Sequence, residues 1–341
     1  MRSAALSLPL FAAITDKVQT IMDVILHIGA QRTATTTFHA YMRGNSAALS
    51  AQGIGYWGPH RTRKRGVLSG LVPVRGSHAP STAVDEAVAR AHGEITADVN
   101  RLKRRRKSHL IVSDENMLGT ARGNVRARSL YPGAAQRLDR VARGFDGIVT
   151  RVVISIRSFE TYWPSALAFS LGRGGRLSRP EELDQMVEQT RSWRDVITDT
   201  ACAFPGVEIV VDDHETYAGR PERRLAHMVD GAIDVPMEHA RLWLHRSPDL
   251  AQLRAAFSKR GGNPAKLPSG EGRWYPFDAL QNAKLRETYA DDMFWLHAGA
   301  DGLATLITED QPDQAGENLP GGATTRGQTH DRKNGGLART G

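Results

Sequence analysis

Short apolar runs occur at four places along the chain and predict buried strands. They span residues 24–28, 109–113, 147–157 and 206–213. Valine, isoleucine and leucine dominate these runs, and polar residues do not alternate regularly with them. Continuous apolar runs of this kind are typical of strands covered on both faces of a parallel sheet.

Segments with helical periodicity separate these runs. Between residues 84 and 102, apolar side chains recur at every third or fourth position, and residues 35–42 and 280–296 are also expected to form helices. Strands that alternate with helices predict crossover connections, so the expected fold class is α/β with a central parallel sheet flanked by helices. Residues 51–66 are rich in glycine, aromatic and basic residues without a period, and a loop is expected there.

Composition divides the 341 residues into three parts. Residues 22–310 contain enough apolar side chains for one large α/β domain. Residues 311–341 hold seven glycines and two prolines but no aromatic residue, so a disordered tail is expected. Residues 1–21 form an N-terminal extension that weakly resembles a signal peptide, although Met22, just before the first strand, is an alternative start.

The charge and the cysteine content indicate which kind of partner and which cellular compartment to expect. The net charge of +8 and a pI of about 9.8 favour an anionic partner. A single cysteine, Cys202, excludes an internal disulfide framework and a multi-cysteine zinc site. A reducing compartment is therefore expected, and the cytoplasm is the predicted location. No apolar run is long enough for a membrane span, so no transmembrane segment is expected.

The segment GAQRTATTT, residues 29–37, joins the first predicted strand to the first predicted helix. The first turn of a helix presents unpaired N–H groups and the positive end of the helix dipole, and both attract anions. Arg32 adds a planar set of donors suited to phosphate or sulfate oxygens. Four hydroxyl-bearing residues follow it: Thr33, Thr35, Thr36 and Thr37. Thr33 or Thr35 is expected to cap the helix, and the loop is expected to hold an oxyanion.

This loop departs from the Walker A motif, because Ala34 occupies the place of the second glycine and no lysine precedes the hydroxyls. The order Arg32-Thr33-Ala34-Thr35-Thr36 instead resembles the 5′-phosphosulfate loop of sulfotransferases, usually Lys-Ser/Thr-Gly-Thr-Thr after an apolar strand. Arginine at the first position resembles the tyrosylprotein branch of that family, while Ala34 departs from the family glycine. The resemblance implies a P-loop NTPase-like sulfotransferase fold and 3′-phosphoadenosine 5′-phosphosulfate as the sulfuryl donor.

A second segment is similar to the family's 3′-phosphate-binding element. Arg157 ends an apolar strand, and Ser165 follows eight positions later. The resemblance implies that both side chains bind the 3′-phosphate. Many members also place a basic-basic-glycine turn over this phosphate, and the candidate here is the turn Lys259, Arg260 and Gly261. The resemblance covers about residues 24–306.

The family places its catalytic base after the strand that follows the first long crossover. In this chain that strand runs into Ser113-Asp114-Glu115. Strand alternation puts Glu115 on the side of Ser113 and Asp114 on the other, so Glu115 near Arg32 is the candidate base. His60 is the alternative, because imidazole titrates near neutral pH and a related branch takes its base from the segment after the first helix.

Together these residues predict a sulfotransferase that acts on a hydroxyl, or on an amine, of a sugar, a lipid or a small molecule. No metal is expected, since a sulfuryl group carries less charge than a phosphoryl group. No nucleic-acid partner is expected either, although the basic run at residues 101–107 would suit one. Two alternatives stay open: a magnesium-dependent P-loop kinase or NTPase, and a binding-only protein in which Ala34 marks an inactive loop.

Overall fold

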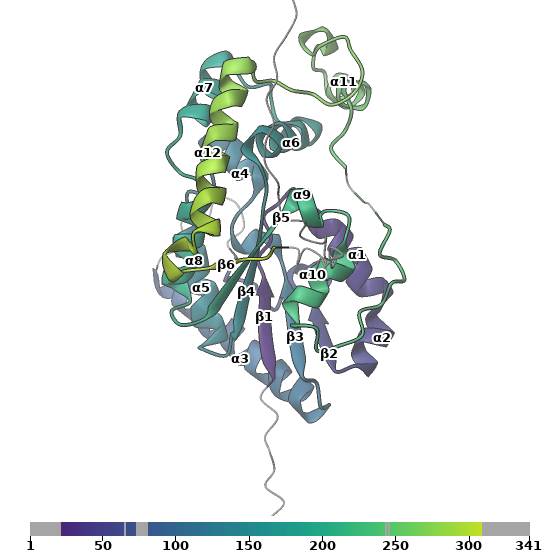
Figure 1. Ribbon diagram of the computed structural model, residues 1–341, viewed down its shortest axis with the longest axis vertical. Coiled ribbons are helices and arrows are strands. Elements are labelled where there is room, and N and C mark those ends of the chain that lie inside the picture. The colour runs from purple at the N-terminus through teal and green to yellow at the C-terminus, as the bar shows by residue number, and fades with distance from the viewer. Residues whose placement is uncertain (1–21, 65, 73–80, 243, 245, 309–341) are drawn as a thin grey trace, which may run out of the picture. The chain divides into compact units, whose positions relative to one another are not determined.

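The computed structural model describes residues 22–308 except 65, 73–80, 243 and 245. Within this part of the chain, six parallel strands form one sheet in the order β2-β3-β1-β4-β5-β6 (Figure 1). The strands are β1 (Asp23–His27), β2 (Ile54–Trp57), β3 (His109–Ser113), β4 (Arg151–Ile156), β5 (Glu208–Asp213) and β6 (Thr305–Leu306). The predicted α/β class with a parallel sheet flanked by helices is confirmed.

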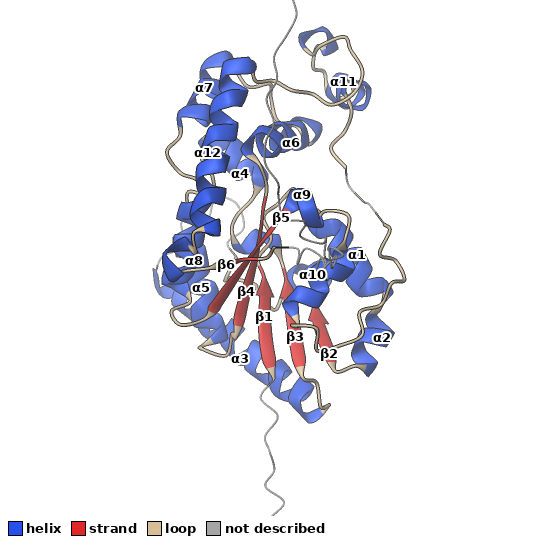
Figure 2. Cartoon of the chain, viewed as in Figure 1, coloured by secondary structure: helices blue, strands red, loops and turns tan. Residues whose placement is uncertain are grey.

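Helices connect the strands and cover both faces of the sheet (Figure 2). The α-helices are α1 (Thr35–Gly44), α2 (Ser46–Ala51), α3 (Ser81–Arg104), α4 (Ala121–Ala127), α5 (Ala134–Phe145), α6 (Phe159–Gly172), α7 (Pro180–Glu188), α8 (Trp193–Ala203), α9 (His214–Tyr217), α10 (Pro221–Met228), α11 (Leu250–Ser258) and α12 (Ala279–His297). The shorter turns are a π-helix η1 (His60–Lys64) and the 3-10 turns η2 (Glu115–Met117), η3 (Pro264–Lys266) and η4 (Ala300–Gly302).

The core has two parts because successive strand side chains point to opposite faces of the sheet. Leu26 and Val112 belong to the larger part, which includes buried residues of α3, α5, α6 and α8. Ile25 and Ile111 belong to the smaller part, with residues of α1, α2 and α10. The strands are therefore buried on both faces, which explains why they are continuous apolar runs in the sequence.

The predicted strands are confirmed as β1, β3, β4 and β5, and the predicted helices at 35–42, 84–102 and 280–296 as α1, α3 and α12. The loop predicted at residues 51–66 is wrong, because this segment forms the edge strand β2 and the π-helix η1. Gly55 weakens the apolar pattern of β2, and a side chain there would meet Leu102 of α3, 3.2 Å from an added Cβ. The N-terminal extension and the tail predicted at 311–341 lie outside the described residues. In the described ranges, no helix has the length and apolar character needed to span a membrane.

The strand order creates a switch point at β1. From β1 the chain moves to β2 and β3 on one side, and then to β4, β5 and β6 on the other. In open α/β sheets, ligands bind beyond the carboxyl ends of the strands at such a point. The residues that follow β1, β3, β4 and β5 at this edge include Arg32, Glu115, Arg157 and His214.

Candidate functional site

The loop between β1 and α1 has an unusual backbone. Gly29, Arg32 and Ala34 all have positive φ values, of 66°, 72° and 65°, a conformation that disfavours residues with a Cβ. Ala34 is the N-cap of α1, and no side chain caps the helix, so the prediction that Thr33 or Thr35 caps it is wrong. Thr33 Oγ1 instead donates to the Ala30 carbonyl oxygen at 2.6 Å. The helix therefore begins with backbone N–H groups that no side chain satisfies, and these suit an anion.

Replacing Ala34 by glycine is expected to relieve backbone strain. Glycine adopts positive φ without steric cost, so Ala34→Gly should raise the free energy of unfolding by about 1 kcal/mol, as measured by chemical denaturation. Ala48→Gly, an exposed position inside α2, is the matched control and should instead lower stability by roughly 0.5–1 kcal/mol. Similar losses at both positions would show that Ala34 is not strained.

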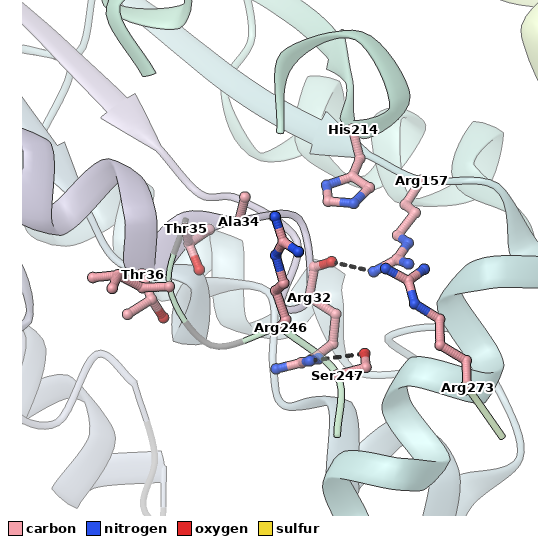
Figure 3. A pocket seen from close by; sticks show the side chains of 10 residues that line it. Arg32, Ala34, Thr35, Thr36, Arg157, His214, Arg246, Ser247 and Arg273 are labelled. Atoms are coloured by element: carbon pink, nitrogen blue, oxygen red, sulfur yellow. Dashed lines mark hydrogen bonds between the residues drawn. The ribbon is translucent and has the colours of Figure 1, made fainter. Parts of the chain in front are cut away.

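The carboxyl edge of the sheet contains a cationic pocket of about 480 Å³ (Figure 3). Its lining brings together segments that are far apart in the sequence, and no carboxylate is among the described residues that form it. The lining residues are Arg32, Ala34, Thr35, Thr36, Arg157, His214, Leu244, Arg246, Ser247 and Arg273. The pocket therefore presents four guanidinium groups, two threonine residues and one imidazole.

Hydrogen bonds join the β1–α1 loop to the end of β4. Arg157 Nη1 donates to the Arg32 carbonyl oxygen at 2.8 Å (Figure 3), and Arg157 Nε donates to Thr161 Oγ1 at 2.9 Å. The Arg32 side chain donates to Ser165 Oγ at 2.9 Å and to Ser247 Oγ at 3.2 Å. The two predicted anion-binding segments are thus parts of one hydrogen-bonded arrangement.

The electrostatics of the cationic pocket favour an anion. Burial lowers the pKa of Arg32 to about 10, and burial together with Arg32 and Arg273 lowers the pKa of Arg157 to about 10. Burial, with Arg157 and Arg224, lowers the pKa of His214 to about 3, so this ring is neutral near pH 7. His214 Nδ1 is buried without a hydrogen-bond partner among the described residues. An anion would offset the mutual repulsion of these cations and supply acceptors.

The threonines of the loop have different environments. Thr35 and Thr36 line the cationic pocket. Thr33 is fully buried and is not among the described lining residues. Thr37 Oγ1 accepts a hydrogen bond from the Leu244 backbone N–H at 3.0 Å. Thr37 therefore holds the segment that carries Arg246, instead of facing the pocket.

A second lobe of about 310 Å³ adjoins the cationic pocket, with which it shares Arg157, Ser247 and Arg273. Ser165 lines this lobe, and its Oγ lies 2.7 Å from Ser247 Oγ. The predicted pair Arg157 and Ser165 therefore borders one lobe, although the hydrogen bond that Ser165 makes to an arginine involves Arg32. Trp274 and Tyr275 add aromatic surface to the same lobe.

Glu115 lies beside the loop, but it is not among the residues that line the cationic pocket. A Cβ added at Gly29 would lie 3.0 Å from Glu115 Cβ and 2.9 Å from Thr35 Cγ2, so Glu115 and Thr35 flank this glycine. Arg63 Nη2 lies 3.0 Å from Glu115 Oε2 and 2.5 Å from Asp114 Oδ1. The prediction that the two carboxylates point to opposite sides is wrong, because Asp114 begins a 3-10 turn and strand alternation ends there.

Other predicted residues lie outside the pocket. His60 is exposed in η1, and the turn Lys259-Arg260-Gly261 is exposed at the C-terminal end of α11. Arg260 Nη1 donates to the Leu171 carbonyl oxygen at 3.3 Å. The basic groups that reach the pocket from the late part of the chain are Arg246 and Arg273, which sequence reasoning missed.

His214 was also not identified as a site residue from the sequence, although the sequence contained a signal for it. It follows the strand predicted at 206–213, so its position at the carboxyl edge was predictable. Arg246 and Arg273 offered no comparable signal, since neither lies in a helix or strand.

A buried polar network lies behind the loop and crosses four strands. Arg224 donates to both Asp212 oxygens, at 2.8 and 3.0 Å, and Ser155 Oγ donates to Asp212 at 3.0 Å. Ser155 Oγ also lies 3.3 Å from His27 Nε2, and His27 Nδ1 lies 2.7 Å from Ser113 Oγ. The Ser155 hydroxyl hydrogen is directed at Asp212, so His27 Nε2 donates to Ser155 and Ser113 donates to His27 Nδ1.

The network continues to Glu115 through His39. His39 Nε2 lies 2.9 Å from Ser113 Oγ, whose own hydrogen is directed at His27, so His39 Nε2 is the donor. The same nitrogen lies 3.9 Å from Glu115 Oε2. Burial lowers the pKa of His39, although Glu115 and Asp114 oppose this change. The orientation of His39 beside the candidate base is therefore fixed by the buried network.

No family model, curated protein or solved structure matches this chain. Among the described residues, no group of three or more histidine, cysteine, aspartate or glutamate side chains is arranged to hold a metal ion. The function is therefore argued from the geometry and chemistry of the site.

Proposed function

We propose that this protein is a sulfotransferase that moves a sulfuryl group from 3′-phosphoadenosine 5′-phosphosulfate to an acceptor hydroxyl. One observation carries the proposal. The two segments that resemble the family's 5′-phosphosulfate and 3′-phosphate elements line one cationic pocket, and the 2.8 Å hydrogen bond from Arg157 to the Arg32 carbonyl joins them. The proposed fold is P-loop NTPase-like, with the binding loop after the central strand β1.

The residues of the pocket suit this donor. Thr35, Thr36 and the uncapped N-terminus of α1 would hold the 5′-phosphosulfate, with Arg32 beside them. Arg157 and Arg273, which border both the cationic pocket and the second lobe, would hold the 3′-phosphate. Trp274 and Tyr275 offer the second lobe aromatic faces against which an adenine ring could pack.

The donor supplies a sulfuryl group that is activated by its anhydride bond to the 5′-phosphate. Glu115 takes the proton of the acceptor hydroxyl as the acceptor oxygen bonds to sulfur and the bond from sulfur to the 5′-phosphate oxygen breaks. Arg32 and the N-terminus of α1 stabilise the charge on the departing phosphate. The products are a sulfate ester and adenosine 3′,5′-bisphosphate. Arg63, 3.0 Å from Glu115, holds the carboxylate in place, and His39 lies 3.9 Å from it.

Arg157→Ala tests the donor site. Hydrogen bonds to charged groups contribute about 1.5–3 kcal/mol, so the Kd for adenosine 3′,5′-bisphosphate should rise roughly 10- to 100-fold. The measurement is calorimetric titration without magnesium. Arg260→Ala, which removes the same charge from outside the pocket, should leave the Kd unchanged. A loss of affinity confined to Arg260→Ala would contradict this assignment.

Binding of the bisphosphate should also take up a proton at His214. The charged groups that face this ring are Arg157, Arg224 and Arg32, and they help to hold its pKa at about 3 in the free pocket. Phosphate offsets these cations and accepts a hydrogen bond from a protonated ring, so the pKa rises on binding. The contribution of His214 to the affinity should therefore increase as the pH falls through this raised pKa, and level off below about 3.

Titrations in buffers with different ionisation enthalpies measure this proton uptake directly. His214→Gln should bind the bisphosphate without the buffer-dependent heat that His214 causes. An identical buffer dependence in the wild type and in His214→Gln would contradict the assignment.

A further inference from the structure

A second basic cavity, the arginine cleft, lies outside the cationic pocket and shares none of its lining residues. It encloses about 660 Å³ of space, part of which is open to solvent. Residues of α4, the end of α6 and the segment leading into α7 form it, and Figure 1 shows these three helices beyond the carboxyl ends of the strands. The lining residues are Arg122, Val125, Arg126, Arg128, Ser170, Gly175, Arg176, Ser178 and Glu182.

Hydrogen bonds connect the β1–α1 loop to the start of α4, the helix that lines part of the cleft. Gln31, the residue before Arg32, donates from Nε2 to Asn116 Oδ1 at 2.7 Å and accepts from the Ala121 backbone N–H at 2.8 Å. This one side chain therefore holds both the residue after Glu115 and the residue before Arg122. Arg122, the first residue of the cleft in the sequence, therefore directly follows a residue that Gln31 holds.

A second contact runs through α6. The Phe169 ring lies 5.0 Å from the Arg32 guanidinium and 4.4 Å from that of Arg173. Ser170, the next residue, lines the arginine cleft. The cleft and the β1–α1 loop are therefore on neighbouring surfaces of α6.

The charge of the cleft is strongly positive. Glu182 is the one carboxylate among its described lining residues, against four arginines. This carboxylate is buried and is bonded by Arg128, at 3.1 Å, and by Arg176. Arg126 is exposed and makes no ion pair with another described residue. Guanidinium groups bind carboxylates and sulfates through paired hydrogen bonds, so the cleft suits an anionic ligand.

We propose that the arginine cleft binds the acceptor, and that this acceptor is an anionic compound with a carboxylate or sulfate group near the hydroxyl to be modified. The assignment of this ligand as the acceptor rests on the proposed sulfotransferase function. Gln31 links the segment of Glu115 to the start of α4, the helix that lines part of the cleft, and the lining of the cleft does not overlap that of the donor site. The basic residues of the cleft would select an acidic acceptor over a neutral one.

The test compares two probes that differ in charge alone. One is an unsulfated chondroitin tetrasaccharide, which carries carboxylates and hydroxyls, and the other is the same tetrasaccharide with its carboxylates reduced to alcohols. Calorimetric titration of the full chain is expected to show at least roughly tenfold tighter binding of the acidic probe. Arg126→Ala should weaken binding of the acidic probe about tenfold, with no effect on the neutral probe. Truncation at this exposed position leaves the Glu182 contacts intact.

Arg90→Ala is the matched control, because Arg90 is an equally charged, exposed residue of α3 that does not line the cleft. It should leave both affinities unchanged. Equal affinity for the two probes, no binding of either, or equal losses in the two variants would overturn the proposal. A parallel titration with adenosine 3′,5′-bisphosphate distinguishes the two proposals, because Arg126→Ala should not change the affinity for the bisphosphate. Failure of the bisphosphate to bind would reject the donor site, and with it the role of the ligand as an acceptor, whereas binding of the acidic probe in the cleft would stand.

Discussion

Glu115→Gln is expected to slow sulfuryl transfer by about 10²- to 10⁴-fold, the usual contribution of a positioned general base. The substitution keeps the size and position of the side chain but removes its ability to accept a proton at neutral pH. Glu115 does not line the donor pocket, so affinity for adenosine 3′,5′-bisphosphate should stay the same. The measurement is transfer of ³⁵S from labelled donor to acidic and neutral hydroxyl compounds, alongside a bisphosphate titration.

His60→Gln is the control for this prediction. His60 is exposed in η1 and is not among the residues lining the cationic pocket, so its substitution should leave the transfer rate unchanged. If His60→Gln abolished transfer while Glu115→Gln did not, the roles of the two residues would be reversed. If the wild type and both variants bound the bisphosphate but none of them transferred sulfate, a binding-only protein would be favoured.

Arg224→Met should destabilise the fold by about 3–5 kcal/mol at pH 8, because it leaves a buried carboxylate without its cation. The side chains of Arg224 and Asp212 are only 1% and 0% exposed, and they lie 2.8 Å apart. Arg224 also donates to the Thr33 carbonyl at 3.4 Å, so the variant loosens the loop as well. Chemical denaturation measures the change.

The loss should depend on pH with a defined sign. Burial raises the pKa of Asp212 above its ordinary value even in the presence of Arg224, and removal of the cation raises it further. When the pKa of a carboxyl group is higher in the folded state than in the unfolded state, the free energy of unfolding falls as the pH rises above the unfolded-state pKa. The loss of stability caused by Arg224→Met should therefore be smaller in acid. The double variant Arg224→Met, Asp212→Asn should recover part of the stability, because no buried charge remains. A loss below 1 kcal/mol at pH 8, or one that grows in acid, would contradict this reading.

The sequence was sufficient to predict the parts of the site that follow directly from strands. Arg32 follows the strand predicted at 24–28 and Arg157 ends the strand predicted at 147–157, and parallel strands bring their carboxyl ends to one edge. The same rule placed Glu115 near the loop, although its partner is Arg63 of the π-helix η1, a segment expected to be a loop. The local sequence pattern is therefore enough to predict a site residue when the sheet alone determines the position of that residue.

Residues brought in by irregular segments could not be predicted in this way. Arg246 and Arg273 reach the pocket from stretches without periodicity, and only tertiary contacts such as that between Thr37 and Leu244 place those stretches. The positive φ of Ala34 was equally hidden, because alanine alone would avoid that conformation. Lys259-Arg260-Gly261 matched a family pattern by composition, but the turn after α11 is exposed and does not line the pocket.

The most direct measurement is a titration of the purified protein with adenosine 3′,5′-bisphosphate in the absence of magnesium, beside a titration with ATP and magnesium. The proposed function predicts micromolar binding of the bisphosphate, much weaker binding of adenosine 5′-monophosphate, which lacks the 3′-phosphate, and no requirement for magnesium. Binding of ATP with magnesium, and none of the bisphosphate, would contradict the sulfotransferase assignment and favour a P-loop kinase or NTPase.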